Sequence, residues 1–425
     1  MDTIVAQATA LVAQPIGIVR ISGPKAHDIA QAITKRDSLN PREAHFLKLY
    51  EKDQVIDHGV VIYFKAPHSF TGEDVVEMQA HGSIYALSNL ISVALTLGAR
   101  LAEPGEFSKR AFLNGKMSLD QVEAVADLIS SNSQRAAKSA VMALEGGLGK
   151  AVDQLQSMLM NLRVLIEAEI DFSEEDIPSI NDEQIKQHLL EILKQLNLLL
   201  QMCKQGVTLQ NGIKIALVGA PNAGKSTLMN RICQKDVSIV TKEAGTTRDV
   251  VARDVIYKGV CLHFLDTAGL RETNSLAEKA GIERSYAAMS EADLVLYIKD
   301  TNANQGVLSV DKNAWIVDNK VDLLTKIPTV RFPISAQEDL GIDVLLDAVL
   351  AHFQLHETTE QPFSARKRHV DVLNRAKASL PREKLPLEML AVMLQQTQDI
   401  LSEITGEVSV DDVLGKLFSD FCVGK

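Results

Sequence analysis

The spacing of the hydrophobic residues changes three times along the chain. The first part, from about residue 3 to residue 116, contains short β-rich runs at 16–21, 59–64 and 74–78, separated by turn sequences such as Ser22 to Pro24. Short β-rich runs bounded by glycine and proline are typical of strands. This part of the sequence therefore predicts an α+β domain.

From about Leu119 the hydrophobic residues follow a helical period. Residues that recur at intervals of three and four positions form one apolar face of a helix. Such stripes indicate the helices of a bundle, and a similar stripe returns near the end of the chain and closes at Gly406, where a glycine suits a helix C-terminus. The stripes are formed by Val152, Leu155, Leu159, Leu162 and Ile166, by Ile185, Leu189, Ile192, Leu196 and Leu199, and by Leu390, Leu394, Thr397, Leu401 and Ile404.

Between the helical parts, apolar runs at 213–218, 260–266 and 294–298 alternate with helical stretches. This alternation predicts an α/β domain with a parallel sheet. Because the ends of a domain usually lie close together, such a domain can be inserted into a helical one. The expected fold is therefore multidomain, α+β and α/β, with an α/β domain inserted into a helical bundle; the motifs of this α/β domain, given below, are those of a P-loop (Ras-like) domain. The expected boundaries are 1–117 for the N-terminal domain, 118–208 and 357–425 for the two parts of the helical domain, and 209–356 for the inserted domain.

Composition narrows the class of protein. A chain of 425 residues is long enough for about three domains. The 44 Lys and Arg residues against 55 Asp and Glu residues give a net charge of -11, so no basic face dominates and any contact with RNA must be local. Four scattered cysteines without a C-x-x-C pair suggest neither a zinc site nor a disulfide framework. With no apolar run of 18 residues or more, a cytoplasmic protein is expected.

The clearest motif is G-x-x-x-x-G-K-S at residues 219–226, between a predicted strand and a predicted helix. This context is the one that a P-loop requires. Its backbone N–H groups can surround phosphates at a helix N-terminus, Lys225 can reach the β- and γ-phosphates, and Ser226 can bind Mg²⁺.

Further motifs follow in the order that a GTPase requires. Asp266 to Gly269 ends a predicted strand and places a carboxylate near Mg²⁺, while Thr246 and Thr247 can close a loop over the metal. In Asn319 to Asp322, the Asp322 carboxylate can accept hydrogen bonds from guanine N1 and N2, which adenine cannot donate. Ser335 and Ala336 offer a backbone donor to guanine O6. The predicted substrate is GTP. The nucleotide-binding residues predicted from these motifs are Asn222, Ala223, Gly224, Lys225, Ser226, Thr227, Thr246, Thr247, Asp266, Thr267, Ala268, Gly269, Asn319, Lys320, Asp322, Ser335 and Ala336. The family resemblance given below adds Thr241, Lys242, Glu243, Ala244 and Gly245.

The group that orients the attacking water is left open by the motifs. Leu270 occupies the position where many GTPases have a glutamine, and leucine cannot orient water. The candidates nearby are Arg248, Arg271, Glu272 and Glu278.

The C-terminal segment ends Phe421-Cys422-Val423-Gly424-Lys425. Cys422 is either a nucleophile or an inert thiol.

These motifs, together with blocks spread over the whole chain, closely resemble the bacterial tRNA modification GTPases of the MnmE/TrmE type. The blocks that carry the resemblance are 2–6, 17–23, 70–74, 104–107, 110–116, 123–129, 245–249, 266–272 and 421–425. The resemblance implies a homodimer joined through N-terminal domains that bind 5-formyl- or methylene-tetrahydrofolate, with Arg20, Glu77 and Lys116 at the folate. It also implies an FAD-containing partner of the MnmG/GidA type, in a heterotetramer or larger complex. Together they would add a carboxymethylaminomethyl-type group at C5 of the wobble uridine, U34, of certain tRNAs.

The resemblance also implies a GTPase that K⁺ activates. Asn222 and the backbone of Thr241, Glu243 and Thr246 would bind K⁺, and Ser226 and Thr247 would hold Mg²⁺. Glu278 would position the water, with Lys225 and the terminal Cys422 as further catalytic residues. Two other functions stay open: an RNA-binding assembly GTPase without modification chemistry, and a folate-binding one-carbon carrier in which GTP regulates assembly.

Overall fold

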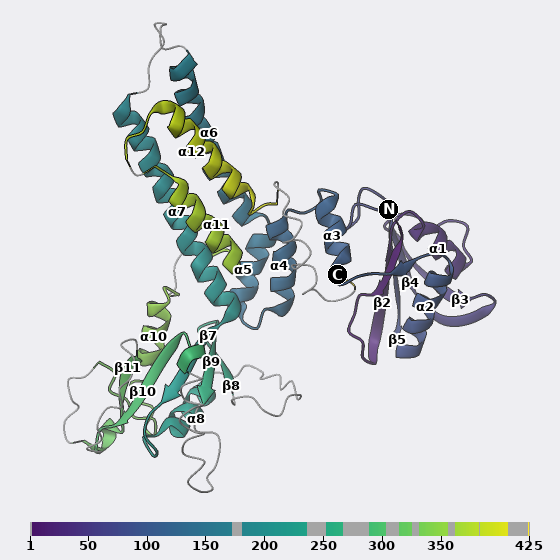
Figure 1. Cartoon of the computed structure of the whole chain (residues 1–425). Coiled ribbons are helices and arrows are strands. Elements are labelled where there is room, and N and C mark those ends of the chain that lie inside the picture. Colours follow the sequence, from purple (N-terminus) through teal and green to yellow (C-terminus); the bar gives the residue numbers. More distant parts are fainter. Residues whose placement is uncertain are drawn as a thin grey trace. The chain divides into compact units, whose positions relative to one another are not determined.

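The computed structural model of the protein separates into two units, residues 1–126 with 395–425 and residues 127–394 (Figure 1). It describes residues 2–171, 181–235, 252–266, 289–302, 314–324, 331–355, 362–381, 383–406 and 424. The first unit contains an α+β domain, and the second contains helices and an α/β sheet. The predicted multidomain α+β and α/β architecture is thereby confirmed.

The first unit is built on a six-stranded sheet with the order β3-β4-β5-β2-β1-β6. Neighbouring strands are antiparallel except β1 and β6, which are parallel. The predicted β-rich runs lie in β2, β4 and β5. The strands are β1 (Ile4–Gln7), β2 (Gln14–Ser22), β3 (Ala44–Glu51), β4 (Gln54–Phe64), β5 (Val75–Gly82) and β6 (Arg100–Leu101).

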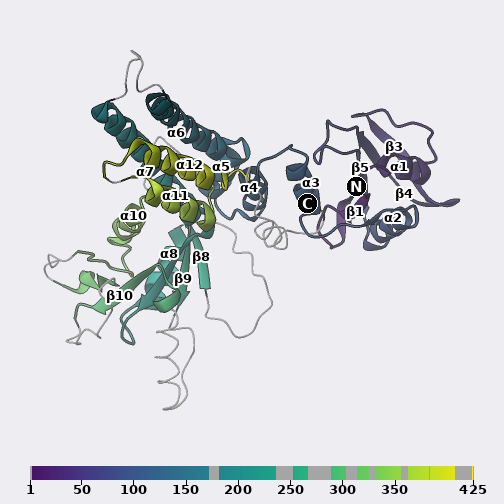
Figure 2. The same cartoon turned by 45° about the horizontal axis from the view of Figure 1, so that its top comes forward.

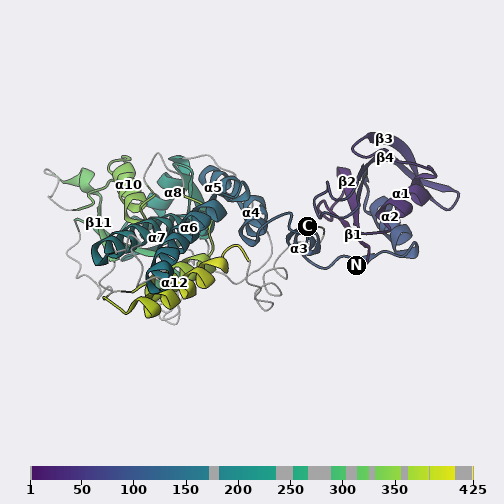
Figure 3. The ribbon, with the colours of Figure 1, turned by 90° about the horizontal axis from the view of Figure 1, so that it is seen from above.

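Two helices, α1 (Ala26–Thr34) and α2 (Ile84–Thr96), cover this sheet, and Figure 3 shows them together beside it. Ile29 and Leu87 on these helices share one buried core with Val19 and Met78 of the sheet. Burying a side chain of this size contributes about 1.5–3 kcal/mol, so this apolar layer is the main force that holds the helices on the sheet.

A network of ion pairs fixes the start of the chain beside helix α3 (Glu106–Leu113). Arg110 is almost fully buried and lies 2.7 Å from Asp2, 3.0 Å from Glu73 and 2.9 Å from Glu106. A hydrogen bond from Arg100 lowers the pKa of Asp2 to about 2. Burial raises the pKa of Glu106, but bonds from Arg100 and Arg110 outweigh it and bring this pKa to about 2. These carboxylates therefore stabilise the fold above their ordinary pKa, and that stability is lost as the pH falls toward 2.

Long helices make up the other part of the structure, and α6, α7 and α11 lie side by side (Figures 1 and 2). The three predicted apolar stripes lie on α6, on α7 and at α12, and their residues are buried, apart from the half-buried Leu189. Asn181 and Gln184 form a capping box that starts α7. The helices are α5 (Gln134–Leu144), α6 (Gly147–Asp171), α7 (Asp182–Asn211) and α11 (Lys367–Ser379), together with α4 (Leu119–Ser130) and α12 (Leu387–Ser402), whose residues are divided between the two units.

Polar contacts of Asp127 join the two halves of the helical part. The buried Asp127 carboxylate accepts a 2.7 Å hydrogen bond from Ser364 Oγ and a 2.9 Å bond from the Arg366 guanidinium. Nearby, Ser139 Oγ donates to the carbonyl of Pro362 at 2.7 Å. Segments more than two hundred positions apart in sequence are thus fastened together, as the insertion hypothesis requires.

The α/β sheet has the strand order β11-β10-β7-β9-β8. Strands β11, β10, β7 and β9 are parallel, as predicted. Strand β8, which was not predicted, is antiparallel to β9, so the predicted parallel sheet carries one antiparallel strand at this edge. The chain reverses direction between β8 and the seven-residue β9 through the short turn at Lys258–Gly259. An antiparallel pair of this kind needs no helical crossover. The strands are β7 (Ile213–Val218), β8 (Ala252–Tyr257), β9 (Val260–Asp266), β10 (Leu294–Asp300) and β11 (Ala314–Asn319).

Alternation along β7 divides its side chains between the two faces of the sheet. Ile215 and Leu217 join the core formed with α8 (Lys225–Lys235) and α10 (Ile342–His352), whereas Ala216 and Val218 pack with Tyr297 on the other face. The sheet is therefore covered on both faces, as parallel sheets usually are. In the part of the chain that the structure describes, no helix is long and apolar enough to span a membrane.

Removal of the Asp127 carboxylate should loosen the helical part. Asp127→Ala leaves the half-buried Arg366 and the buried Ser364 without their acceptor, so we expect a loss of about 2–3 kcal/mol in the free energy of unfolding. Urea unfolding of the full chain, followed by circular dichroism, measures this change. Asp153→Ala removes an exposed carboxylate from α6 and should change stability by less than about 0.5 kcal/mol. Equal effects of the two substitutions would contradict the role given to Asp127.

Candidate nucleotide-binding site

Four parallel strands bring the predicted motifs to one edge of the α/β sheet. In the register, Leu217 of β7 lies opposite Asp266, which ends β9, and Asp300, which ends β10, lies opposite Asn319, which ends β11. Ligands of open α/β sheets bind beyond the carboxyl ends of the strands. The segments that follow β7 and β11 therefore start at a common edge where a nucleotide can be bound.

The loop after β7 has the backbone shape of a P-loop. Gly224 has φ +95, and a Cβ there would lie 2.2 Å from the Asn319 side-chain nitrogen, so only glycine fits. Asn222 is in the left-handed region at φ 63. Lys225 Nζ donates to the carbonyls of Gly219 at 2.7 Å and Ala220 at 3.0 Å, which folds the loop around this ammonium group.

Helix α8 starts at Lys225, directly after the loop. The first N–H groups of a helix lack partners within the helix, and the helix dipole adds partial positive charge, so this end attracts phosphate. Ser226 and Thr227 are exposed in the first turn. Their hydroxyls are accessible for a phosphate or a metal ion, as the motif predicts.

Asn319 links the P-loop to the predicted guanine loop. Its side-chain nitrogen donates to the carbonyl of Ala223 at 2.8 Å, and its oxygen accepts from Ala336 N–H at 3.0 Å. Asn319 is almost fully buried, so each lost bond would leave a polar group unpaired. The sequence motif predicts a nucleotide contact at this residue, whereas the geometry shows a positioning role that no local pattern reveals.

The remaining guanine-motif residues lie on the turn that follows β11. Lys320, at φ 65, donates to Asp300 at 2.7 Å, and the exposed Asp322 lies in a short 3₁₀ helix (Val321–Leu323). The N–H of Ser335 donates to the carbonyl of Leu340, and that of Ala336 donates to Asn319. Recognition of guanine O6 by Ala336 therefore requires its N–H to be shared with, or released from, Asn319.

Several predicted residues lie outside the described part of the chain. They are Thr241, Lys242, Glu243, Ala244, Gly245, Thr246, Thr247, Arg248, Thr267, Ala268, Gly269, Leu270, Arg271, Glu272, Glu278 and Cys422. Asp266 is described through its backbone, which ends β9.

A second group of predicted residues surrounds one loop of the N-terminal sheet. Arg20 of β2 and Glu77 of β5 are directly paired in the register, and the Arg20 guanidinium contacts the Glu77 carboxylate at 2.9 Å and 3.0 Å. The same guanidinium lies 5.7 Å from the Phe70 ring and 5.6 Å from the Phe107 ring. Cation–π contacts of this kind hold a guanidinium in place. Arg20 also donates to the Gly424 carbonyl in the C-terminal tail, at 3.4 Å.

Lys116 approaches the same loop from the segment after α3. Its side-chain carbons lie 3.2 Å from the position that a Cβ on Gly72 would occupy, and Asn114 donates to the carbonyl of Thr71 at 2.7 Å. Arg20 touches this loop through Phe70, and Lys116 touches it at Gly72. The three predicted folate residues therefore gather around residues 70–72.

The α/β sheet, the P-loop and the guanine motif define the class of protein: a P-loop protein that binds guanine nucleotides. Family models match nearly the whole chain, with the MnmE helical domain at residues 119–422 and the GTP-binding protein TrmE N-terminus at residues 3–116. The tRNA modification GTPase MnmE of Francisella tularensis subsp. holarctica is 44% identical over 447 residues, covering 100% of this chain and 99% of the relative. That of Francisella philomiragia has the same identity and coverage. The chain belongs to the MnmE family of tRNA modification GTPases.

Among solved structures, the G domain of the FeoB iron transporter of T. maritima is 24% identical and covers 33% of this chain and 99% of its own, with a TM-score of 0.26. The fold described above rests on the strand order and register of the chain itself.

Loss of the Asn319 side chain should weaken nucleotide binding through the loops that it joins. Asn319→Ala removes both bonds and leaves the Ala223 carbonyl and the Ala336 N–H unpaired, so we expect the affinity for GDP and GTP to fall by about 10–100-fold. Titration with a fluorescent guanine nucleotide measures the affinity. Asn230→Ala, which changes an exposed asparagine on α8, is the matched control. An affinity for the Asn319 variant equal to that of the control would contradict the bridging role.

Proposed function

We propose that this chain is a K⁺-activated GTPase that works with an FAD-containing partner of the MnmG/GidA type. Together they carry out the folate-dependent addition of a carboxymethylaminomethyl-type group at C5 of U34 in certain tRNAs. The observation that carries the proposal is the P-loop held to the guanine loop by Asn319, in a chain that aligns along its whole length with tRNA modification GTPases. GTP is the substrate of the site on the α/β sheet.

The described residues support the hydrolytic part of the proposal. Lys225 lies at the start of α8 within the curve of the P-loop, where its charge can stabilise the β- and γ-phosphates. The exposed Ser226 hydroxyl, with Thr247, would hold Mg²⁺, which supplies positive charge between the phosphate oxygens. Asp322 is exposed beside the same edge and can accept bonds from guanine.

Potassium binding is assigned to Asn222 with the backbone of Thr241, Glu243 and Thr246. Asn222 is exposed at the tip of the P-loop, and its left-handed backbone is one that asparagine tolerates well. A bound K⁺ would supply the positive charge that an arginine provides in other GTPases. Glu278 would position the attacking water, because Leu270 occupies the place of the water-orienting glutamine and cannot do so.

The N-terminal domain is proposed to bind the tetrahydrofolate and to form the homodimer. Arg20, Glu77 and Lys116 combine two cations and a carboxylate, with Arg20 at the Phe70 ring, Glu77 bonded to Arg20, and Lys116 beside Gly72. The flat pterin ring of a folate has donors for a carboxylate, and its glutamate tail is anionic and attracts a cation, so this residue set fits the ligand. Cys422 is proposed to take part in the modification chemistry as a thiol.

Replacement of K⁺ by Na⁺ at fixed Mg²⁺ and ionic strength should slow GTP turnover by roughly tenfold or more. K⁺ is larger than Na⁺ and is expected to fit the proposed site at Asn222. Its charge stabilises the transition state only when the ion is held beside the transferring phosphate. Phosphate release by the purified full chain measures the rate. Equal rates in the two salts would remove K⁺ and Asn222 from the proposal.

Two variants test the roles proposed for Asn222 and Glu278 in the potassium experiment. Asn222→Gly keeps the left-handed backbone but removes the amide oxygen, so the ratio of the rates in K⁺ and Na⁺ should fall toward one. Glu278→Ala should bind GTP and yet hydrolyse it slowly in both salts, because the proposed contact is made only in the transition state.

Substitution of Arg20 should weaken folate binding. Arg20→Ala removes a charge-assisted donor, and we expect the affinity of the full chain for 5-formyltetrahydrofolate to fall by about 10–100-fold. Calorimetric titration measures the affinity, and the melting temperature shows whether the unpaired Glu77 has destabilised the domain. The exposed Arg36 lies in the same domain, and Arg36→Ala should bind as the unchanged protein does. Equal affinities for both variants would contradict a folate site at Arg20.

A further inference from the structure

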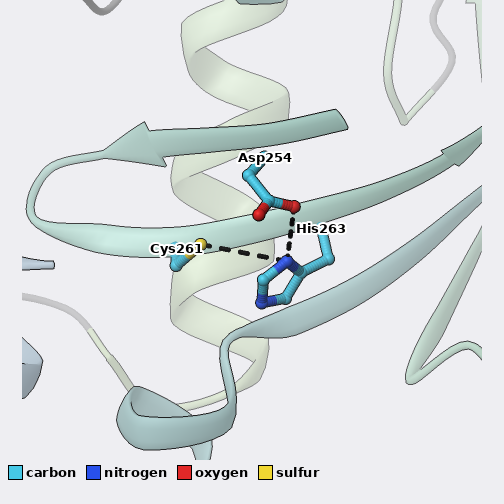
Figure 4. Close-up of side chains that lie close together, drawn as sticks. All are labelled: Asp254, Cys261 and His263. Carbon is cyan, nitrogen blue, oxygen red and sulfur yellow. Dashed lines mark hydrogen bonds and ion pairs between the residues drawn. The ribbon is translucent and has the colours of Figure 1, made fainter. Parts of the chain in front are cut away.

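Three side chains with metal-binding atoms meet on the hairpin at the edge of the α/β sheet (Figure 4). Asp254 on β8 lies opposite His263 on β9 in the antiparallel register. Cys261 precedes His263 by two residues, so both point to the same face of the strand. Strand pairing thus creates a thiol, imidazole and carboxylate cluster, defined here as Asp254, Cys261 and His263.

The atoms of this cluster are close enough to share one ion. Nδ1 of His263 lies 2.6 Å from Asp254 Oδ1 and 4.0 Å from Cys261 Sγ, and the three ligand atoms all lie within 4.8 Å of one another. Ligands of Zn²⁺ stand about 2.0–2.3 Å from the ion, so two ligands of a tetrahedral site are about 3.3–3.8 Å apart. To hold one ion, the 2.6 Å contact between His263 and Asp254 must lengthen and the 4.0 Å distance between His263 and Cys261 must shorten, and small rotations of the three side chains allow both changes.

The second nitrogen of His263 is already oriented as in many metal sites. Nε2 lies 3.1 Å from the carbonyl of Asn211, the last residue of α7. A metal-bound histidine commonly donates its other N–H to a backbone carbonyl, which fixes the ring and leaves the first nitrogen for the ion. Gly212 makes this approach possible, because a Cβ there would lie 2.3 Å from Nε2.

We propose that Asp254, Cys261 and His263 bind one Zn²⁺ ion through the Asp254 carboxylate, the Cys261 thiolate and His263 Nδ1. A thiolate and an imidazole favour zinc over Mg²⁺ or Ca²⁺, which prefer oxygen ligands. Cys261 is buried and Asp254 is exposed, so the sulfur side of the ion is shielded and the fourth position faces water. This site is separate from the nucleotide motifs at the carboxyl ends of the parallel strands.

A bound ion would fix the orientation of the His263 ring, and this ring joins the hairpin to the point where the chain enters the α/β sheet. Asn211 ends α7, and β7 begins at Ile213, so the His263 ring holds this connection through the Asn211 carbonyl. The position of the ring would then be fixed on both sides, by the ion and by the carbonyl.

The test uses the full chain without an affinity tag, freed of metal by a chelator and kept free of nucleotide and Mg²⁺. Co²⁺ is added as a spectroscopic probe, and Zn²⁺ then displaces it. We expect one equivalent to bind with a Kd on the order of 1 µM or tighter, with the near-ultraviolet charge-transfer band of a thiolate ligand. No saturable binding, or binding without this band, would overturn the proposal.

Matched variants show whether the thiolate ligand is Cys261 and not Cys233 or Cys422. Cys261→Ser should abolish the band, and Asp254→Asn should weaken binding by about tenfold or more. Cys233→Ser, on α8, and Cys422→Ser should keep both the band and the affinity. Persistence of the band in Cys261→Ser, or its loss in Cys233→Ser or Cys422→Ser, would contradict the assignment. Fluorescent-nucleotide binding by each variant shows that its α/β sheet is folded, and the exposed position of Asp254 makes its variant informative even where Cys261→Ser unfolds.

Discussion

Parallel pairing of β7 with β9 and β10, and of β10 with β11, is the constraint on which the chemistry of the α/β sheet depends. In a parallel sheet all strands end at the same edge, so motifs separated by up to about a hundred residues come together without any direct attraction between them. The buried Asn319 then fixes the distance between two of these loops by bonding to Ala223 and Ala336. The glycine at position 224 is needed because this amide lies so close to the loop.

The sequence predicts well those features of the structure that depend only on residues close together in the chain. The P-loop and the Asn319 to Asp322 motif are short, and the helical stripes repeat within a single element, so each could be located without knowledge of the fold. Strand β8 was missed because its hydrophobic residues lack a distinctive pattern and its place depends on pairing with β9. The cluster at Asp254, Cys261 and His263 was not predicted for the same reason: cysteine spacing along the chain cannot show a ligand that a neighbouring strand supplies.

In the N-terminal domain, the sequence predicted three of the six strands, β2, β4 and β5, from their residues, but the candidate ligand site only through a family resemblance. The pairing of Arg20 with Glu77 depends on the register of β2 and β5, and Lys116 reaches the same loop from a segment outside the sheet. The network of Asp2, Glu73 and Arg110 could not be predicted either, since Asp2 and Arg110 are 108 positions apart in sequence. Burial of this charge is tolerated because the guanidinium has several carboxylate partners.

The insertion hypothesis requires both ends of the α/β part to be held near the same place, and the described contacts are consistent with this requirement. Where the chain enters, His263 bonds to the carbonyl of Asn211. Where it leaves, the carbonyl of Leu355 accepts a bond from Arg135 of α5, whose backbone N–H also donates to Gly259 at the turn between β8 and β9. The edge hairpin is thus connected to the entry point through His263 and to the exit point through Arg135. A change in the position of this hairpin would therefore act on both connections to the helices at once, so among the described residues the antiparallel edge of the sheet is linked to both the entry and the exit of the α/β part.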